Sequence, residues 1–392
     1  MMTSDVNYSW DEVTGLCSSL GKNIGVAIDA LAEGVVIFGA GAQGRFAINY
    51  LREKGIKIIC LADNNPDKQG TLFDDIPVLP PQDASVTSAP IVLIAVRQYL
   101  APLFLQLDEL GIVSMSFAAF FVVSNMDRIT HVRNNLLSDD RSRLIYDGIL
   151  KTMLTGDNSS CAAVMEGNQY FALPEFVNIG NDHFVDAGAY VGDTVEKFIW
   201  SNSGVFTQIY AFEPGETQLT AMKQRVNRLC REWAIPKSAI ICENAGLADK
   251  NKSLTISVSN VLANTSLNYD SLGNGTQAGN IFCYSLDNYL AGRPATFIKA
   301  DIEGMELAML HGAKETIRQY KPKMALSIYH NPAHLFEVAE YVNSLAPEYS
   351  MAVRHHSPIF AESVLYCWVP QEKFSYSANV QARFGSKGVL DE

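Results

Sequence analysis

The chain lacks the features of several protein classes. Its 392 residues carry a formal net charge of -12, and Lys and Arg form no basic run. Because such a chain repels phosphate backbones and anionic bilayers, we expect neither nucleic acid nor membrane surfaces as partners. No apolar stretch approaches the roughly 18 to 20 residues that a spanning helix needs, and no basic, apolar leader opens the chain. We therefore expect a cytoplasmic protein.

Cysteine is also scarce. The seven cysteines are an odd number, widely scattered and mostly in apolar, strand-like contexts, and none forms a C-x-x-C pair. This pattern does not indicate a disulfide framework or a common zinc motif. We interpret the cysteines as reduced core residues, with a zinc site or a catalytic thiol as the alternative.

Length and hydrophobicity favour two folded domains. The chain is 48% hydrophobic and 18% charged, which is too apolar for disorder and enough for two cores. Apolar runs at residues 34–39, 57–63 and 91–96 alternate with helical spacing at 43–54 and before residue 110. Alternating strands and helices predict an open parallel sheet. We place this Rossmann-like domain at residues 1–125.

Residues 126–392 are predicted to hold a helical bridge and a second α/β domain. Helical spacing marks the bridge within residues 127–155. The last apolar segment, 362–369, would close the sheet edge as an antiparallel strand. Together the halves predict two Rossmann-like three-layer domains, the second mostly parallel. Five further segments look like strands that run into loops: 184–188, 208–214, 239–246, 296–304 and 323–330.

The strand-loop-helix segment FVDAGAYVGDT (184–194) is typical of a nucleoside-binding turn. Gly188 and Gly192 allow a sharp turn and close approach to a ligand, and Asp193 with Thr194 can begin the next helix. Its glycine spacing differs from that of the dinucleotide fingerprint. Asp186 before the loop suits the cationic amino-acid end of S-adenosylmethionine, directly or through water. An ordinary glycine-rich turn is the alternative.

The next two strands end in groups that suit the rest of a nucleoside. Glu213, followed by Pro214, stands where a carboxylate can accept hydrogen bonds from both ribose hydroxyls. A solvated loop glutamate is the alternative. Asn244 and Ala245 end the third strand and are small enough to contact a purine edge.

A lysine and an aspartate occupy alternate positions near the end of a later strand. Lys299 and Asp301 should therefore point to the same side and reach one space at the carboxyl end of the sheet. Ionisable groups that converge at the crevice of an open α/β sheet are usually functional. A buried structural pair is the alternative.

Seven segments of the second half follow one another in a characteristic order and spacing: FVDAGAYVGDT, AFEP, NAGLAD, SLDNYL, FIKADIEGMELAMLHGA, PKMALSIYHNPAHL and ESVLYCW. Together they resemble the FkbM-type methyltransferase family over residues 178–368. The resemblance implies a class I methyltransferase fold, S-adenosylmethionine as donor, S-adenosylhomocysteine as product, and O-methylation of a sugar or polyketide-type hydroxyl. The resemblance implies that Asp186, Gly188 and Gly192 form the cofactor loop, with Ala189 inside it. It also implies that Glu213 is the ribose ligand and that Asp301 lies near the reacting sulfonium.

Methyl transfer to a hydroxyl needs an aligned acceptor and a base. His330, at a strand end on the same rim as Asp301, is the predicted base. A histidine that is hydrogen-bonded within its own loop is the alternative for His330, and Asp301 is the alternative base. Lys299 would orient the acceptor. We predict no metal, although carboxylates of Asp301 and Glu303 could hold a divalent cation.

The N-terminal domain carries a second glycine-rich turn. Gly39, Gly41, Gln43 and Gly44 follow a strand, and Asp63 ends the next strand, as in a dinucleotide-binding turn. VVIFGAGAQGRFAINYLREKG with LADNNPDKQG also resembles Rossmann-like domains attached to sugar-modifying enzymes, which implies a nucleotide or nucleotide-sugar as ligand. An empty docking or oligomerisation module is the alternative.

We therefore predict an S-adenosylmethionine-dependent methyltransferase that acts on a small-molecule acceptor, with a sugar favoured. An NAD-linked oxidoreductase and a non-catalytic nucleotide sensor, both centred on the N-terminal turn, are the alternatives. The sequence is also compatible with a homo-oligomer.

Overall fold

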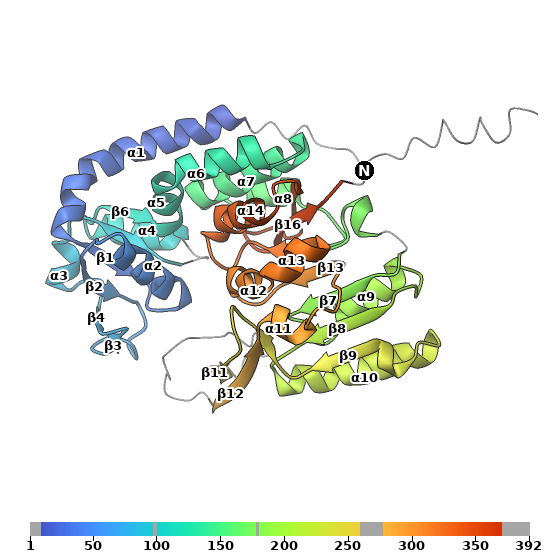
Figure 1. The fold of residues 1–392 in the computed structure, drawn as a ribbon. Helices are drawn as coiled ribbons and strands as arrows, with labels where there is room; N and C mark the ends of the chain where they lie inside the picture. Colours follow the sequence, from blue (N-terminus) through green and yellow to red (C-terminus); the bar gives the residue numbers. More distant parts are fainter. Residues whose placement is uncertain (1–8, 97–99, 178–179, 259–276, 371–392) are drawn as a thin grey trace, which may run out of the picture.

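A computed structural model shows α/β architecture in both halves of the chain (Figure 1). It describes residues 9–96, 100–177, 180–258 and 277–370, so Asn178, where the family resemblance begins, lies outside the described residues. The prediction of mostly parallel sheets with helices on them is confirmed.

The N-terminal half is built on a six-stranded sheet of order β3-β4-β2-β1-β5-β6. Neighbouring strands are parallel except β3 and β4. The predicted strands at 34–39, 57–63 and 91–96 are β1, β2 and β5. The elements are α1 (Trp10–Glu33), β1 (Val35–Phe38), α2 (Ala42–Glu53), β2 (Ile58–Ala62), β3 (Leu72–Phe73), β4 (Ile76–Leu79), α3 (Ala84–Thr87), β5 (Val92–Ile94), α4 (Leu100–Glu109) and β6 (Ser114–Ser116).

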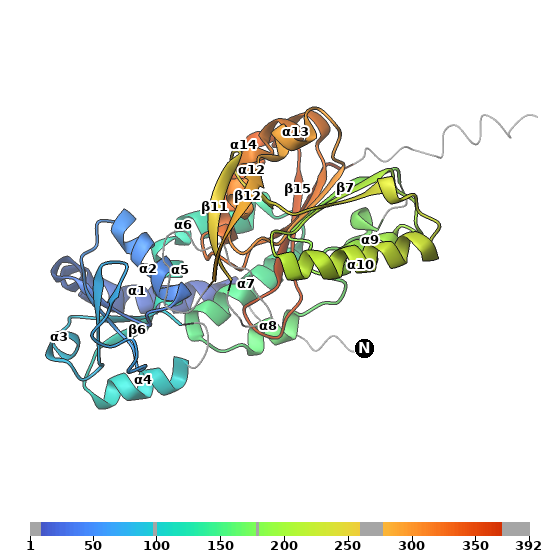
Figure 2. The same cartoon turned by 90° about the horizontal axis from the view of Figure 1, so that it is seen from below.

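A group of helices joins the two sheets, as predicted for the bridge. Ser116 caps the first of them through its side chain, Asp139 caps α7, and Gly156 ends α7 in the left-handed conformation. Helix α7 contacts α1, α5 and strand β15, so it lies between the halves (Figures 1 and 2). The helices are α5 (Phe117–Ser124), α6 (Met126–His131), a π-helical turn (Val132–Leu136), α7 (Asp140–Thr155) and α8 (Ser159–Val164).

The C-terminal half contains a seven-stranded sheet of order β15-β16-β14-β13-β7-β8-β9. The last strand, β16, is antiparallel as expected, but it lies between β14 and β15 and not at the edge. The elements are a 3-10 turn (Pro174–Phe176), β7 (His183–Ala187), α9 (Asp193–Ser201), β8 (Gln208–Phe212), α10 (Glu216–Glu232), a 3-10 turn (Lys237–Ala239), β9 (Ile240–Glu243), β10 (Gly246–Leu247), β11 (Lys252–Val258), β12 (Gln277–Tyr284), α11 (Leu286–Leu290), β13 (Phe297–Ala300), α12 (Glu306–Gly312), α13 (Lys314–Tyr320), β14 (Lys323–Ser327), α14 (His334–Leu345), β15 (Ser350–His355) and β16 (Ser363–Trp368).

A small sheet of order β10-β12-β11 stands beside the large one and was not predicted (Figure 2). Its strands β11 and β12 pair antiparallel over seven register positions. Strand β10 continues the chain directly beyond β9, so the small sheet borders the carboxyl edge of the large one.

One hydrophobic core runs through both halves of the molecule. It includes buried residues of β1 and β2, of α5 and α7, and of β13 and β14. At the junction Phe121 stacks on Phe336 with ring centroids 5.8 Å apart. Tyr146 is fully buried and its hydroxyl donates to the carbonyl of Leu335 at 3.0 Å. These contacts hold α5 and α7 of the helical bridge against α14, the helix that follows β14.

The order in which the chain adds strands to the large sheet changes sides between β7 and β13. From β7 it proceeds to β8 and β9 on one side, whereas β13 and β14 lie on the other. A crevice opens at the carboxyl ends of the strands at such a point, and ligands of open α/β sheets bind there.

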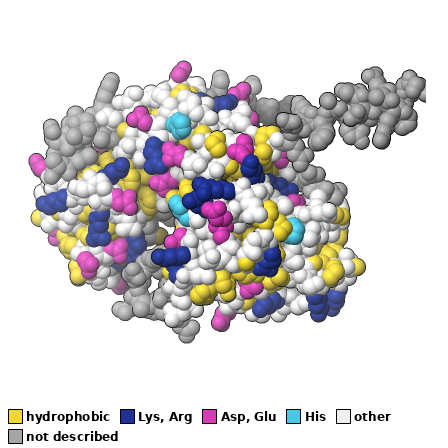
Figure 3. Space-filling model, in the orientation of Figure 1, with side chains coloured by type: hydrophobic (Ala, Val, Ile, Leu, Met, Phe, Trp, Pro, Cys, Tyr) yellow, Lys and Arg dark blue, Asp and Glu magenta, His cyan; other side chains and the backbone are white. Residues whose placement is uncertain are grey.

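The surface carries charges of both signs. Figure 3 shows basic and acidic side chains interspersed across one face of the molecule. Among the residues that the structure describes, no helix is both long and apolar enough to cross a bilayer.

Candidate active site

A cavity of about 270 Å³ lies at this crevice. It is lined by residues from the segments that follow β7, β8, β9, β13, β14 and β15 of the large sheet, together with residues from the segment before β7. The lining residues are Gln169, Tyr170, Gly188, Tyr190, Asp193, Thr194, Lys197, Phe212, Glu213, Pro214, Gly246, Leu247, Lys299, Asp301, Ile302, Glu303, Tyr329 and Glu362.

The loop between β7 and α9 passes very close to the end of β13. Gly188 has φ 77°, and a Cβ atom at this position would lie 1.9 Å from the carbonyl oxygen of Asp301. Only glycine fits there. Gly192 has φ 80° and begins α9, while Asp193 and Thr194 line the cavity. The prediction that this segment forms a tight ligand-facing turn agrees with its geometry, whereas Ala189 is buried beneath it.

The buried side chain of Lys299 binds the backbone of this loop from inside the protein. Its side chain is 2% exposed and its Nζ lies 3.0 Å from Oδ1 of the fully buried Asp186. Nζ also donates to the carbonyls of Gly188 at 2.6 Å and Ala187 at 3.2 Å. Burial alone would lower the pKa of Lys299, but the carboxylates of Asp186 and Asp301 raise it above its ordinary value, so the ammonium stays charged.

These contacts change how Lys299 and Asp186 can act. An ammonium has three hydrogens, and three oxygen partners already surround this one. We therefore give Lys299 a positioning role in place of contact with an acceptor. Asp186 is buried behind the loop and can influence a cofactor only through Lys299 and the backbone.

Glu213 ends β8 with its carboxylate fixed by backbone amides. Oε2 accepts from the N–H of Tyr190 at 2.9 Å, and Oε1 accepts from the N–H of Gly215 at 2.7 Å. Burial raises the pKa of Glu213, and the two amides oppose that rise. Each oxygen keeps further lone-pair capacity toward the cavity. The residue is thus oriented as a ribose ligand would be, with Pro214 beside it.

The third strand contributes different residues from those predicted. Asn244 is exposed, and its amide donates to the carbonyls of Glu213 and Pro214, at 3.3 and 3.1 Å. Ala245 is buried. Gly246 and Leu247, which directly follow Ala245, line the cavity. The backbone and side chain of β10 therefore form part of the cavity wall.

Asp301 follows β13 and is held by two tyrosines that the sequence did not indicate. Tyr170 donates to Oδ2 at 2.6 Å, and Tyr329 lies 3.2 Å from Oδ1. Burial and the Asp301 charge raise the pKa of Tyr170 well above its ordinary value, so this phenol remains a donor. Tyr329 also lies 3.2 Å from Glu362, which links the loop after β14 to the one before β16.

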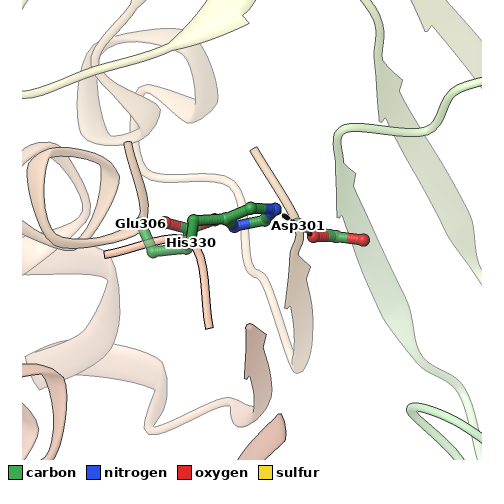
Figure 4. Close-up of side chains that lie close together, drawn as sticks. All are labelled: Asp301, Glu306 and His330. Atoms are coloured by element: carbon green, nitrogen blue, oxygen red, sulfur yellow. Dashed lines mark hydrogen bonds and ion pairs between the residues drawn. The ribbon is translucent and has the colours of Figure 1, made fainter. Parts of the chain in front are cut away.

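His330 lies between this carboxylate and a second, deeper one (Figure 4). Its Nδ1 is 2.8 Å from Oε1 of Glu306, and its Nε2 is 3.4 Å from Oδ1 of Asp301. Burial alone would lower the pKa of His330, but the Glu306 hydrogen bond and the neighbouring carboxylates raise it to about 9. The imidazole is thus protonated at neutral pH and is not poised to accept a proton. Its predicted role as base remains a prediction that the geometry does not favour.

Glu306 is fully buried and is the anchor of this group. Its Oε1 lies 2.8 Å from Nδ1 of His330, and its Oε2 lies 3.2 Å from Nδ1 of His334. Backbone amides of Ile302 and Gly304 also donate to Oε1, at 3.0 and 3.4 Å. Against desolvation, these partners hold the pKa of Glu306 well below its ordinary value. Glu306 belongs to one of the segments that carry the family resemblance, but its position in the sequence did not indicate a function for it.

His355, the last residue of β15, and His356, which follows it, do not belong to the cavity lining. His355 is fully buried and its Nδ1 contacts Oγ of Ser363 at 2.8 Å. The ring of His356 contacts the carbonyl of Glu166 at 3.0 Å and the hydroxyl of Tyr366 at 3.1 Å. Both rings are thus hydrogen-bonded parts of the core rather than contacts for an acceptor.

His355 should make the fold sensitive to acid. Burial lowers its pKa from 6.5 to about 4, so between these values the unfolded chain binds a proton that the folded chain does not. The free energy of unfolding should fall as pH falls through this window, by up to about 3 kcal/mol. Urea unfolding at several pH values measures it. His355→Gln should flatten the dependence and His311→Gln, at an exposed position, should not. An equally steep fall in His355→Gln would contradict the assignment.

The N-terminal glycine turn has the expected backbone, but the carboxylate of its acidic residue, Asp63, is already hydrogen-bonded within the protein. A Cβ atom at Gly44 would lie 1.9 Å from the carbonyl oxygen of Gly39. Oδ2 of Asp63 accepts from the N–H of Ala40 at 2.9 Å and from Lys68 Nζ at 3.0 Å, and Oδ1 accepts from the N–H of Asn65 at 2.9 Å. Asp63 therefore braces the turn itself. The structure gives no support to the predicted nucleotide site formed with Gly41 and Gln43.

Comparisons with known proteins agree with this geometry. Residues 186–350 match the family model described as a methyltransferase FkbM domain. This part of the chain is a methyltransferase FkbM domain. Residues 31–116 match a separate model described as C2185-like, N-terminal. No curated protein matches the chain significantly.

One solved structure shares the fold of both halves of the chain. A crystal structure of methyltransferase FkbM from Methylobacillus flagellatus KT is 20% identical, with 91% of this chain and 98% of that chain covered and a TM-score of 0.57. An rRNA methylase from Streptococcus thermophilus is 16% identical over 50% of this chain and 90% of its own, with a TM-score of 0.30. The first match extends over both halves, so their combined arrangement also occurs elsewhere.

Proposed function

We propose that the FkbM domain transfers a methyl group from S-adenosylmethionine to a hydroxyl of a small molecule, with a sugar as the favoured acceptor. The observation that carries this proposal is the position of Glu213. Its carboxylate is preset by two backbone amides at the end of the strand after the glycine loop, and it faces the same cavity as Asp301.

The cavity residues fit the parts of the cofactor. Glu213 would accept from the ribose hydroxyls, and Gly246 with Leu247 would flank the purine. The loop at Gly188 would let the methionine portion approach the backbone, because no side chain stands there. Bound in this way, S-adenosylmethionine supplies an electrophilic methyl group on its sulfonium.

The acceptor end of the cavity is rich in carboxylates and hydroxyls. Asp301, Glu303 and Glu362 line it, with Gln169 and Tyr329 among them. Groups of this kind hydrogen-bond to hydroxyls, which supports a polyhydroxylated acceptor. They repel anions, so an unphosphorylated region of the acceptor should face them.

The reaction balances without an oxidant. The acceptor hydroxyl gives its proton to the carboxylate of Asp301, and the acceptor oxygen forms a bond to the methyl carbon. The bond from methyl to sulfur breaks and its electron pair stays on sulfur, which leaves a methyl ether and S-adenosylhomocysteine. Alignment of oxygen, carbon and sulfur is the main contribution that the cavity can make.

Glu213→Gln should weaken binding of S-adenosylhomocysteine by about 10- to 100-fold, because charge-assisted hydrogen bonds to ribose are lost. Calorimetric titration measures the change. Glu216→Gln, three residues along and exposed at the start of α10, is the matched control and should bind as the wild type does. Equal affinities in the two variants would show that Glu213 is not the ribose ligand.

A further inference from the structure

The cavity lining carries more negative than positive charge. Lys197 and Lys299 are its only cations among the residues that the structure describes. Lys299 is already surrounded by Oδ1 of Asp186 and two backbone carbonyls. The ammonium of Lys197 is therefore the positive group of this lining that a ligand can use. The acids of the lining are Asp193, Glu213, Asp301, Glu303 and Glu362.

Lys197 and Asp193 share one face of α9. They are four positions apart, so their side chains are neighbours along the helix, and both line the cavity. Within the described part of the chain, neither side chain forms an ion pair or a hydrogen bond. The neighbouring acid Glu196 does not neutralise Lys197, because it pairs with Arg225 and Arg228 of α10. An acid and a base one helical turn apart are thus both open to a ligand.

The order of the strands determines which part of S-adenosylmethionine would meet these two residues. Its sulfur carries three branches: the ribose, the methyl group that is transferred, and the amino-acid chain. Glu213, the proposed ribose ligand, follows β8, and Asp301 follows β13 at the acceptor end. Strand β7 lies between these two strands, and the glycine loop after it leads directly into α9. The amino-acid chain is therefore left with the segment that carries Asp193 and Lys197.

The free end of that chain is a zwitterion, with one ammonium and one carboxylate. The acids of the lining would repel this carboxylate, so it needs a cation beside it. Asp186, which the sequence suggested for the amino-acid end, is buried behind the glycine loop. A lysine ammonium donates charge-assisted hydrogen bonds to a carboxylate, and an aspartate accepts them from an ammonium. Lys197 and Asp193 therefore offer the two charges that complement the zwitterion.

We propose that Lys197 binds the carboxylate of the methionine part of the cofactor and that Asp193 binds its ammonium. This inference rests on the proposed function, because it concerns the same cofactor in the same cavity. It makes the domain selective for ligands with an intact amino-acid end. Methylthioadenosine has the purine, the ribose and the sulfur but no amino acid, so it can bind without either residue.

Calorimetric titration of the full chain with S-adenosylhomocysteine and, separately, with methylthioadenosine tests the two residues. Lys197→Met should weaken S-adenosylhomocysteine binding by about 5- to 30-fold, because a charge-assisted contact at a solvent-exposed lysine is lost. Methylthioadenosine binding should not change, and Asp193→Asn should give the same pattern. Glu213→Gln should weaken both ligands, since both carry the ribose. Lys223→Met, exposed on α10 outside the lining, is the control and should bind both ligands as the wild type does.

The contrast between the two ligands separates a contact with the amino acid from a general effect on the cavity. Unchanged S-adenosylhomocysteine affinity in Lys197→Met would overturn the inference. Equal losses for both ligands would also overturn it, because the substitution would then act on the shape of the cavity. Lys197→Arg keeps the charge and should retain most of the affinity. A wild-type chain that binds neither ligand would contradict the proposed function itself, so the two failures are distinguishable.

Discussion

Asp301→Asn is expected to slow methyl transfer by about 10²- to 10⁴-fold, the usual effect of removing a group that takes part in proton transfer. The carboxylate lines the cavity beside the end of the cofactor loop, and two tyrosines orient it. An amide at this position can still accept one of these hydrogen bonds but cannot take a proton. Release of S-adenosylhomocysteine, with the best acceptor from a panel of free and nucleotide-linked sugars, gives the rate.

The affinity of Asp301→Asn for S-adenosylhomocysteine should remain that of the wild type, because Glu213 and the glycine loop are untouched. Asp249→Asn, at an exposed acid on the loop before β11, should be as fast as the wild type. A full rate in Asp301→Asn, with normal cofactor affinity, would remove this residue from the chemistry.

Lys299→Met is expected to lower the free energy of unfolding by about 3–5 kcal/mol, because it leaves a buried carboxylate without its counter-charge. Asp186 is fully buried and its partner Nζ lies 3.0 Å away. The variant also loses the hydrogen bonds to the carbonyls of the glycine loop. Urea unfolding followed by fluorescence measures the loss, and S-adenosylhomocysteine binding should weaken with it.

Two further variants separate the charge effect from a packing effect. The double variant Lys299→Met with Asp186→Asn removes both charges and should recover part of the lost stability. Lys321→Met removes a lysine from an exposed ion pair and should change stability far less. A Lys299→Met protein as stable as Lys321→Met would contradict the account of the loop.

The sequence predicted those features that depend on local patterns. Strands β7, β8 and β13 are apolar runs that end in glycine or an acid, so their loops could be located before the structure was known. Parallel strands present these ends at one edge, which is why Glu213 and Asp301 were expected in one cavity. Gly188 was equally predictable, since a tight turn after a strand favours glycine.

Other features depend on contacts between distant segments. Tyr170 reaches Asp301 across 131 positions of sequence, and it stands in a segment without a recognisable motif. The pairing of Lys299 with Asp186, rather than with its near neighbour Asp301, follows from strand register. The direction of Asn244 was not predictable either, because its amide satisfies two backbone carbonyls outside the cavity.

The raised pKa of His330 also depends on a contact that the sequence pattern does not reveal. A histidine at a strand end suggests a base, because its ordinary pKa is near neutral. Glu306, 24 positions earlier, changes that by holding the ring in its charged form. Likewise, Asp63 matches the dinucleotide pattern in sequence, but its own loop and Lys68 occupy its oxygens.

Calorimetric titration of the full chain with S-adenosylhomocysteine, and separately with NAD, tests the central claim most directly. We predict one site for S-adenosylhomocysteine per chain and no comparable binding of NAD. Binding of NAD without binding of S-adenosylhomocysteine would contradict the assignment of the cavity at Glu213 and Asp301 as the cofactor site.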